Sequence, residues 1–170
     1  MQNKRTSNAT MLFAMILVDV LIKIVIDNLF MGKKFLINDR IGFLPFLNTE
    51  QLSILNNEFG MEIDLMYLIA INIIGFFVLI WVRSRLKKEK EWSTGLDIGT
   101  IMILAGVICS LIDKLFWKGS LDYILFFSKI VDLKDIYMFI GLFVCIIDLG
   151  RQGVGLVRTY LNKWWSNPKL

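Results

Sequence analysis

The chain has 170 residues, of which 56% are hydrophobic, with a formal net charge of +4 and no histidine. Its mean hydropathy of +0.62 is well above that of a soluble globular domain, which excludes an ordinary soluble protein and predicts one membrane domain over residues 1–170. The absence of histidine excludes zinc-hydrolase signatures and histidine-assisted nucleophiles, so acid–base chemistry must rest mainly on carboxylates, lysines or tyrosines.

Four apolar stretches are long enough to cross a membrane as helices, which takes roughly 20 residues. They cover about residues 9–30, 61–82, 95–117 and 133–155. We therefore expect an all-α membrane protein, a bundle of four transmembrane helices with a small extracytoplasmic loop region after the first helix. Pro45 argues against a regular helix in that loop, and its apolar clusters leave short strands open as a weakly signalled alternative.

Basic residues are concentrated between the second and third spans, where Arg83, Arg85, Lys87, Lys88 and Lys90 lie, and at both ends of the chain. The positive-inside rule therefore predicts that both termini and this link are cytoplasmic. The two other loops, at about residues 31–60 and 118–132, are then extracytoplasmic. Topology and contact with anionic lipid explain the basic run more simply than nucleic-acid binding does, so we expect membrane lipid as a partner and no nucleic acid.

The first span contains Asp19 and Lys23, four positions apart, with Asp27 further along the same helical face. A charge near mid-bilayer costs roughly 2.5 to 3.5 kcal/mol, so pairing of Asp19 with Lys23 is expected for either a structural or a functional role. These charges, and the lack of a small-residue cleavage site, indicate a true span and not a cleaved signal.

The middle spans carry few polar residues. Asn72 in the second is expected to be an interhelical hydrogen-bonding residue. Gly106, Ser110 and Asp113 recur at helical spacing in the third, so this stripe must face neighbouring helices and not lipid. Lys114 lies beside Asp113 near the outer boundary.

Cys109 and Cys145 lie within predicted spans and are expected to be small buried apolar residues. Neither suggests a metal site.

Three aspartates lie around the second outer loop. Asp122 follows the third span and Asp135 opens the fourth, so antiparallel packing of these spans brings both carboxylates near the outer boundary. Two carboxylates in a partly dry site cannot both ionise cheaply, and one protonated and one charged acid are what aspartic proteolysis uses. Ordinary interface charges are the alternative, and for Asp132 a role as the N-terminal cap of the fourth span.

Four segments in this order resemble motifs of the signal peptidase II family, the bacterial lipoprotein signal peptidases. "DVLIK" is similar to D-x-x-x-K, and "FLNTEQLS" resembles the start of N-T-G-A-A-F. "GVICSLIDKLFWKGSLDYI" resembles G-A-x-G-N-x-x-D-R followed by V-V-D-F, and "VDLKDIYMFIG" resembles F-N-x-A-D-x-x-I-x-x-G. The resemblance spans about residues 11–150.

The resemblance implies that Asp122 and Asp135 are the catalytic aspartates. It further implies supporting or substrate-binding positions at Asp19, Lys23, Asn48, Ser110, Asp113, Lys114 and Asp132. The chain departs from the motifs at Glu50, Gln51 and Leu52, in place of Gly-Ala-Ala. Ser110 and Asp132 each replace an asparagine, and Lys114 replaces an arginine.

The implied function is intramembrane aspartic endopeptidase activity in the bacterial cytoplasmic membrane, with the site toward the extracytoplasmic face. Its substrate would be a prolipoprotein or another lipidated peptide, cut before a diacylglyceryl cysteine by a monomer. An activated water is the nucleophile, so no metal or organic cofactor is expected.

Two alternatives stay open. One is a non-catalytic relative that binds lipidated or amphipathic peptides. The other is a small transporter with an ion path through Asp19, Lys23 and Asp113, although the chain shows no internal repeat or broken spans.

Overall fold

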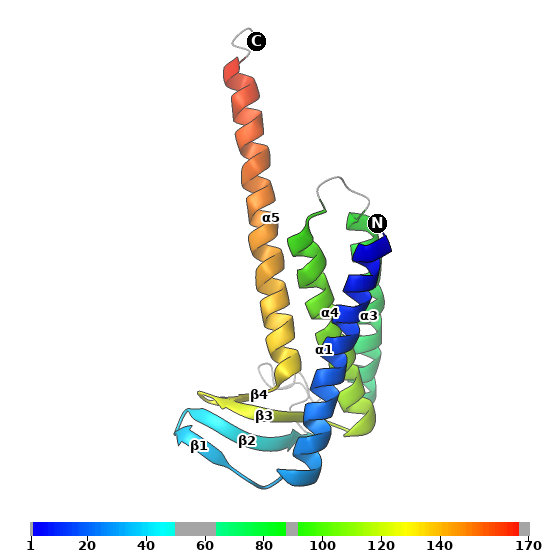
Figure 1. Ribbon diagram of the computed structural model, residues 1–170, viewed down its shortest axis with the longest axis vertical. Coiled ribbons are helices and arrows are strands. Elements are labelled where there is room, and N and C mark those ends of the chain that lie inside the picture. The colour runs from blue at the N-terminus through cyan, green and yellow to red at the C-terminus, as the bar shows by residue number, and fades with distance from the viewer. Residues whose placement is uncertain (1, 50–63, 88–91, 167–170) are drawn as a thin grey trace.

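The structure is a computed structural model, and it describes residues 2–49, 64–87 and 92–166. The described helices are α1 (Gln2–Leu29), α3 (Leu65–Leu86), α4 (Thr94–Phe116) and α5 (Leu133–Ser166). The strands are β1 (Phe35–Asn38), β2 (Ile41–Asn48), β3 (Ser120–Phe126) and β4 (Lys129–Val131). The helices run alongside one another, the sheet lies across one end of the bundle, and α5 reaches well beyond the other helices at the opposite end (Figure 1).

Three of these helices are long and apolar enough to cross a membrane, over Ser7–Leu29, Leu65–Arg85 and Thr94–Phe116. They agree with the first three predicted spans, apart from residues 61–63, which lie outside the described residues. These helices are consistent with a membrane protein fold. The fourth crossing stays a prediction, because the described part of α5 combines exposed apolar side chains with charges near its start and around Asp148.

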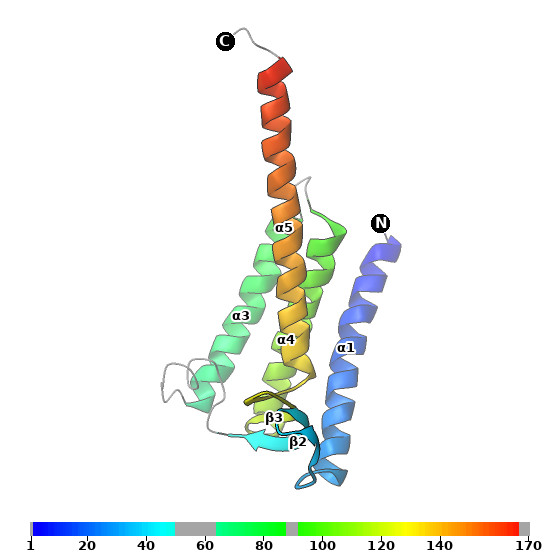
Figure 2. The same ribbon diagram turned by 90° about the vertical axis from the view of Figure 1, so that its left-hand side faces the viewer.

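α4 is the central helix of the bundle, because it packs against α1, α3 and α5 (Figure 2). Its contact with α5 is close. A Cβ atom added at Gly141 of α5 would lie 2.7 Å from the backbone oxygen of Gly99 on α4, and one added at Gly106 would lie 3.0 Å from the backbone oxygen of Lys134. Small residues at helix contacts allow this approach in membranes, and here they bring the start of α5 against α4.

Polar side chains join the helices at depth and near the end opposite the sheet. Asn72 donates to the Ser110 hydroxyl at 3.3 Å, which confirms the interhelical hydrogen bond expected of this asparagine. Arg83 of α3 and Lys87, which directly follows α3, form ion pairs with the buried Asp97 of α4, at 2.5 and 2.9 Å. These contacts fix α3 against α4.

The sheet corrects the sequence-based expectation. Its strands are antiparallel in the order β1-β2-β3-β4, so both outer loops contribute, and the prediction of an all-α fold with strands open only after the first helix was incomplete. The register shifts between Phe43 and Phe46, around Pro45. Proline cannot donate a ladder hydrogen bond, which explains an irregularity at this place.

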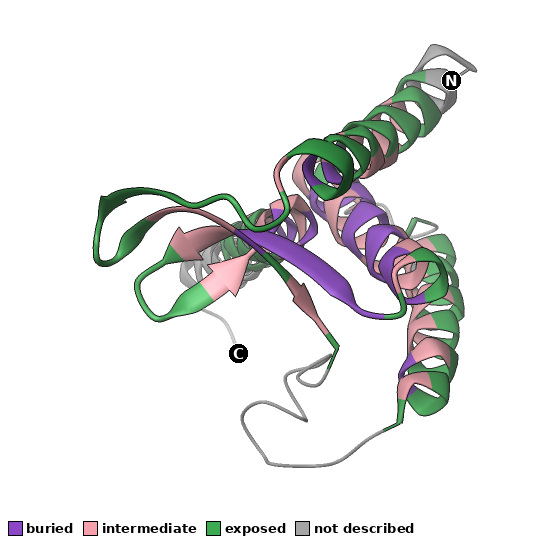
Figure 3. Ribbon diagram, turned by 90° about the horizontal axis from the view of Figure 1, so that it is seen from below, coloured by how far each residue is buried: buried purple, intermediate pink, exposed green. Residues whose placement is uncertain are grey.

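β3 divides its side chains between two environments. Leu121 and Tyr123 pack with Ile26 of α1 in the buried apolar cluster below the bundle. Because side chains alternate along a strand, Ser120 and Asp122 face the other way. All four residues are buried, and this part of the sheet lies beside the buried end of α4 (Figure 3). The Asp122 side chain is therefore buried because its neighbours in the strand, Leu121 and Tyr123, belong to the apolar core.

Candidate active site

β3 supplies the first part of the site. The Ser120 hydroxyl donates a hydrogen bond of 2.7 Å to Asp122 Oδ1, as expected for two residues on one face of a strand. Asn48 of β2 pairs with Ser120 in the sheet register. The predicted supporting residue Asn48 therefore lies at the edge of the site, one strand away from Asp122.

The start of α5 supplies the second part through a reciprocal cap. The backbone N–H of Asp135 donates to Asp132 Oδ1 at 3.1 Å, and the backbone N–H of Asp132 donates to Asp135 Oδ2 at 3.3 Å. This is the arrangement of a capping box, with aspartate in place of the usual glutamate. The predicted capping role of Asp132 is borne out by this geometry, and the same cap orients Asp135.

These two parts meet. One carboxylate oxygen from each of Asp122, Asp132 and Asp135 lies within 4.8 Å of the others. Asp122 and Asp132 are buried and Asp135 is half-buried. The fold therefore brings together the two aspartates that the sequence pattern pairs, and it adds a third beside them.

Lys134 is the residue of the site that sequence reasoning missed. Its ammonium group lies 2.5 Å from Asp132 Oδ2, 3.0 Å from Asp113 Oδ2 and 3.4 Å from Asp122 Oδ1. It also donates to the Ser120 hydroxyl at 2.7 Å. The available signal was a lysine between two aspartates at the first turn of an apolar helix.

Lys23 forms a second charged centre beside the first, and the two centres share Asp113 and Asp132. Its ammonium group lies 2.9, 2.7 and 2.6 Å from the carboxylates of Asp19, Asp113 and Asp132, and all four side chains are fully buried. The pairing of Asp19 with Lys23 was predicted. The structure extends it, because Lys23 joins α1 to α4 and to the start of α5 through charges that share Asp113 and Asp132 with Lys134.

Ser110 and Lys114 lie on the side of α4 toward α3. The Lys114 ammonium donates to the Ser110 hydroxyl at 2.8 Å and to its backbone oxygen at 3.4 Å. Ser110 also accepts from Asn72. The two residues are buried near the aspartates, but their hydrogen bonds run along α4 and to α3.

Burial and the lysines act oppositely on the carboxylates. Burial raises the pKa of Asp122 above its ordinary value, and the Lys134 ammonium opposes this only in part. Burial alone would also raise the pKa of Asp132, but the ammonium groups of Lys134 and Lys23 hold that pKa below its ordinary value. Of these two carboxyl groups, Asp132 is therefore the more readily ionised, as the partner of both lysines.

The spacing of Asp122, Asp132 and Asp135 would also suit a metal ion. However, the Lys134 ammonium already contacts two of these carboxylates, and its charge opposes a cation among them. The donor set therefore fits a proton-sharing site better than a metal centre.

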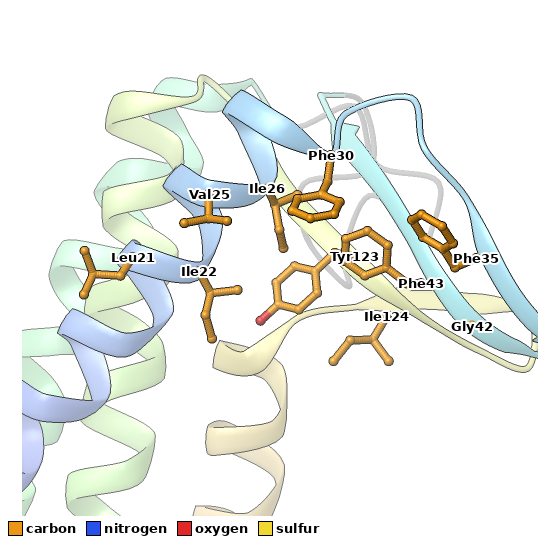
Figure 4. Close-up of a pocket in the computed structure, with 10 residues that line it drawn as sticks. All are labelled: Leu21, Ile22, Val25, Ile26, Phe30, Phe35, Gly42, Phe43, Tyr123 and Ile124. Carbon is orange, nitrogen blue, oxygen red and sulfur yellow. The ribbon is translucent and has the colours of Figure 1, made fainter.

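An apolar pocket of about 620 Å³ lies on the other side of β3, between α1 and the sheet (Figure 4). The Tyr123 ring lies at its inner end, with its hydroxyl pointing toward the start of α5. Leu21 and Val25 of α1 line the pocket and are exposed. The pocket is lined by Leu21, Ile22, Val25, Ile26, Phe30, Phe35, Gly42, Phe43, Tyr123 and Ile124.

The family model described as Signal peptidase (SPase) II matches residues 11–151. The chain belongs to the signal peptidase II family. Its membership makes it a bacterial membrane protein of a family of aspartic peptidases that process lipoproteins, and it confirms the resemblance drawn from the sequence motifs.

Two solved structures share the fold of this signal peptidase II family member. One is a bacterial membrane enzyme solved by the in meso method at 2.3 Å resolution, with a TM-score of 0.70 and 15% identity over 87% of this chain and 90% of that chain. The other is a bacterial membrane enzyme solved by the same method at 1.9 Å resolution, with a TM-score of 0.69 and 16% identity over 85% of this chain and 92% of that chain. No curated protein sequence is significantly similar to the chain.

The departures from the signal peptidase II motifs lie in different places. Glu50, Gln51 and Leu52 lie outside the described residues. Asp132 and Lys134, which stand where the motif has asparagine and alanine, contact each other in the site. The motif positions that changed in charge are therefore neighbours in space.

Proposed function

We propose that this chain is an aspartic endopeptidase that cleaves the signal peptide of prolipoproteins just before the diacylglyceryl-modified cysteine. The observation that carries the proposal is the meeting of Asp122 and Asp135 beside a buried lysine, in a chain of the signal peptidase II family. Asp122 comes from β3, which follows α4, and Asp135 comes from the first turn of α5. Asp135 is half-buried, and we expect water to reach the pair past this side chain.

In the proposed reaction, one carboxylate of the pair takes a proton from a water molecule as the water oxygen attacks the scissile carbonyl carbon. The resulting tetrahedral intermediate collapses, the carbon–nitrogen bond breaks, and the other aspartate gives its proton to the departing amine. The pair thus returns to one proton and one charge, with their places exchanged. Two carboxylates this close titrate as a unit.

The apolar pocket supports a lipidated substrate. It is lined almost entirely by apolar groups, and β3 separates it from the aspartates by the thickness of one strand. A diacylglyceryl group could reach it from the bilayer along the exposed face of α1. Burial of apolar surface contributes roughly 25 cal/mol per Å², so even partial burial of two acyl chains would contribute substantially to substrate binding.

We place the sheet at the extracytoplasmic side and both termini in the cytoplasm, with the chain acting as a monomer. The start of α1, the far end of α5 and the end of α3 all lie opposite the sheet (Figure 1). The last turn of α3 carries Arg83 and Arg85, and Lys87 follows it. The positive-inside rule favours this orientation.

The test is cleavage of a synthetic diacylglyceryl-modified precursor by purified protein in detergent. Asp122→Asn and Asp135→Asn are each expected to lower the rate by at least about 1,000-fold, because each removes a proton acceptor or donor from the reaction. Asp39→Asn, which changes an exposed aspartate at the tip of the sheet, is the matched control and should cleave normally. Cleavage by either dyad variant at the parent rate would refute the peptidase assignment and leave only peptide binding.

A further inference from the structure

The Asp122 and Asp135 carboxylates, although close, have different neighbours. Asp122 Oδ1 accepts a hydrogen bond from the Ser120 hydroxyl and lies 3.4 Å from the Lys134 ammonium. Asp135 Oδ2 accepts from the backbone N–H of Asp132. Hydrogen bonds and an adjacent cation favour the ionised form of a carboxyl group. The donors around Asp122 therefore stabilise a negative charge there.

Lys134 acts on Asp122 both directly and through Ser120. Its ammonium donates to the Ser120 oxygen at 2.7 Å, and the Ser120 hydroxyl donates in turn to Asp122. A hydroxyl that accepts from a cation becomes a stronger donor. The two hydrogen bonds are thus donated in sequence, from Lys134 to Ser120 and from Ser120 to the Asp122 carboxylate.

We propose that Lys134 is a positioning residue that keeps Asp122 ionised, so that Asp122 is the base that activates water and Asp135 is the acid that protonates the leaving amine. The assignment rests on the proposed peptidase function and deepens it. Asp132 completes the arrangement, because it anchors the Lys134 ammonium at 2.5 Å and its own charge disfavours a second charge on Asp135.

The charged groups around Asp122 come from three further elements. The start of α5 brings Asp132, Lys134 and Asp135, α4 brings Asp113 and Lys114, and α1 brings Lys23 with Asp19 behind it. β2 presents the uncharged Asn48 opposite Ser120. Lys134 is the cation among them that contacts Asp122 itself. Its removal should therefore raise the pKa of Asp122.

A serine–lysine mechanism is the competing use of the same atoms, because Ser120 Oγ lies 2.7 Å from Lys134 Nζ. Such a mechanism needs a neutral amine as the base. Three carboxylates within 3.4 Å of the Lys134 nitrogen favour the charged ammonium instead. The structure therefore favours Lys134 as a fixed cation over Lys134 as a base.

The pH dependence of cleavage tests the assignment. The base must be ionised to accept a proton, so the cleavage rate falls at low pH as Asp122 becomes protonated. This low-pH fall, the acid limb of the rate profile, therefore follows the pKa of Asp122. Lys134→Met should move that limb upward by about 1 to 3 pH units, and Asp132→Asn should move it downward by about 1 unit. The double variant should lie between them, Lys134→Arg should restore the parent profile, and the control Lys34→Met, at an exposed lysine near the sheet, should leave it unchanged.

A structural role alone would lower activity without moving the limbs in opposite directions. The proposal is overturned if Lys134→Met and Asp132→Asn both leave the acid limb in place. It is also overturned if Ser120→Ala abolishes cleavage while Asp122→Asn does not, since that pattern indicates a serine nucleophile. Under our assignment Ser120→Ala loses one hydrogen bond to Asp122, which is expected to cost about tenfold in rate.

A measurement without substrate separates this proposal from the proposed function. The Asp122 carboxyl band can be followed by infrared difference spectroscopy during a pH titration, assigned by its loss in Asp122→Asn. Its midpoint should be higher in the double variant Lys134→Met with Asp132→Asn than in Asp132→Asn alone, a comparison that avoids leaving an unpaired carboxylate. An unmoved midpoint overturns the role of Lys134, whereas a moved midpoint in a protein that cleaves nothing overturns only the peptidase assignment.

Discussion

Replacement of Lys23 by methionine tests how far the buried charges hold the helices together. The ammonium group of Lys23 contacts three fully buried carboxylates, on α1, on α4 and at the start of α5. Asp113 and Asp132 keep the ammonium of Lys134 when Lys23 is removed, but Lys23 is the ion-pair partner that the described structure gives to Asp19. The variant therefore leaves Asp19 as an uncompensated buried charge.

The size of the effect follows from that orphaned charge. Breaking a buried ion pair by removing one partner costs about 3 to 5 kcal/mol. For a chain of this size, each kcal/mol corresponds to about 2 to 4 °C in Tm, so Lys23→Met should lower the Tm by about 6 to 20 °C. The double variant with Asp19→Asn removes the orphaned charge and should recover most of this loss.

Thermal unfolding in detergent, followed by fluorescence of the five tryptophans, measures the change. Lys114→Met is the matched control. Lys114 is also a buried lysine, but the hydrogen bonds that it makes within the described residues go to the backbone oxygen and hydroxyl of Ser110. It should lose only about 1 kcal/mol. The reasoning is refuted if Lys23→Met unfolds at the parent temperature, or if Asp19→Asn deepens the loss in place of repairing it.

Three further predictions follow from the fold. Burial raises the pKa of Asp122 in the folded protein above its value in the unfolded chain. The folded protein therefore loses stability as the pH rises through the folded pKa and Asp122 gives up its proton, while below the unfolded pKa Asp122 is protonated in both states. Asp122→Asn should therefore unfold at a higher temperature than the parent above neutral pH, with no difference below about pH 4. Gly106→Leu should push the start of α5 from α4 and lower cleavage by about 100-fold or more, while Gly75→Leu, in open space, should not. Cysteine at Lys34 should react with a membrane-impermeant maleimide from the extracytoplasmic side, and cysteine at Lys87 only from the cytoplasmic side; the reverse pattern would invert the proposed orientation.

The parts of the fold that hydropathy controls could be predicted from the sequence. The first three spans were located to within a few residues, since a membrane helix needs a long apolar run and little else. The strands of the second outer loop were missed. Residues 120–123 at the start of β3 are buried on both faces of the strand. Leu121 and Tyr123 therefore alternate with Ser120 and Asp122 without the polar, exposed positions that normally reveal a strand.

The site was predicted where spacing within one helix was enough. Asp19 and Lys23 are one helical turn apart, and the structure pairs them directly. Lys134 was missed because its partners come from elsewhere in the fold. Its contacts with Asp113 and Ser120 depend on the close packing of α4 against α5 and on the turn into β3, neither of which is encoded in the local pattern around Lys134.

The balance of charges explains why a site of this kind retains protons. Five carboxylates gather around the ammonium groups of Lys23 and Lys134, namely those of Asp19, Asp113, Asp122, Asp132 and Asp135. Full ionisation would leave negative charge in excess in a region with little water, which is costly. Asp113 and Asp132 each contact both lysines, and the two ammonium groups hold the pKa of Asp132 below its ordinary value. A shared proton on the remaining pair, Asp122 and Asp135, lowers the excess, and a pair that holds one proton and one charge is what acid–base hydrolysis requires.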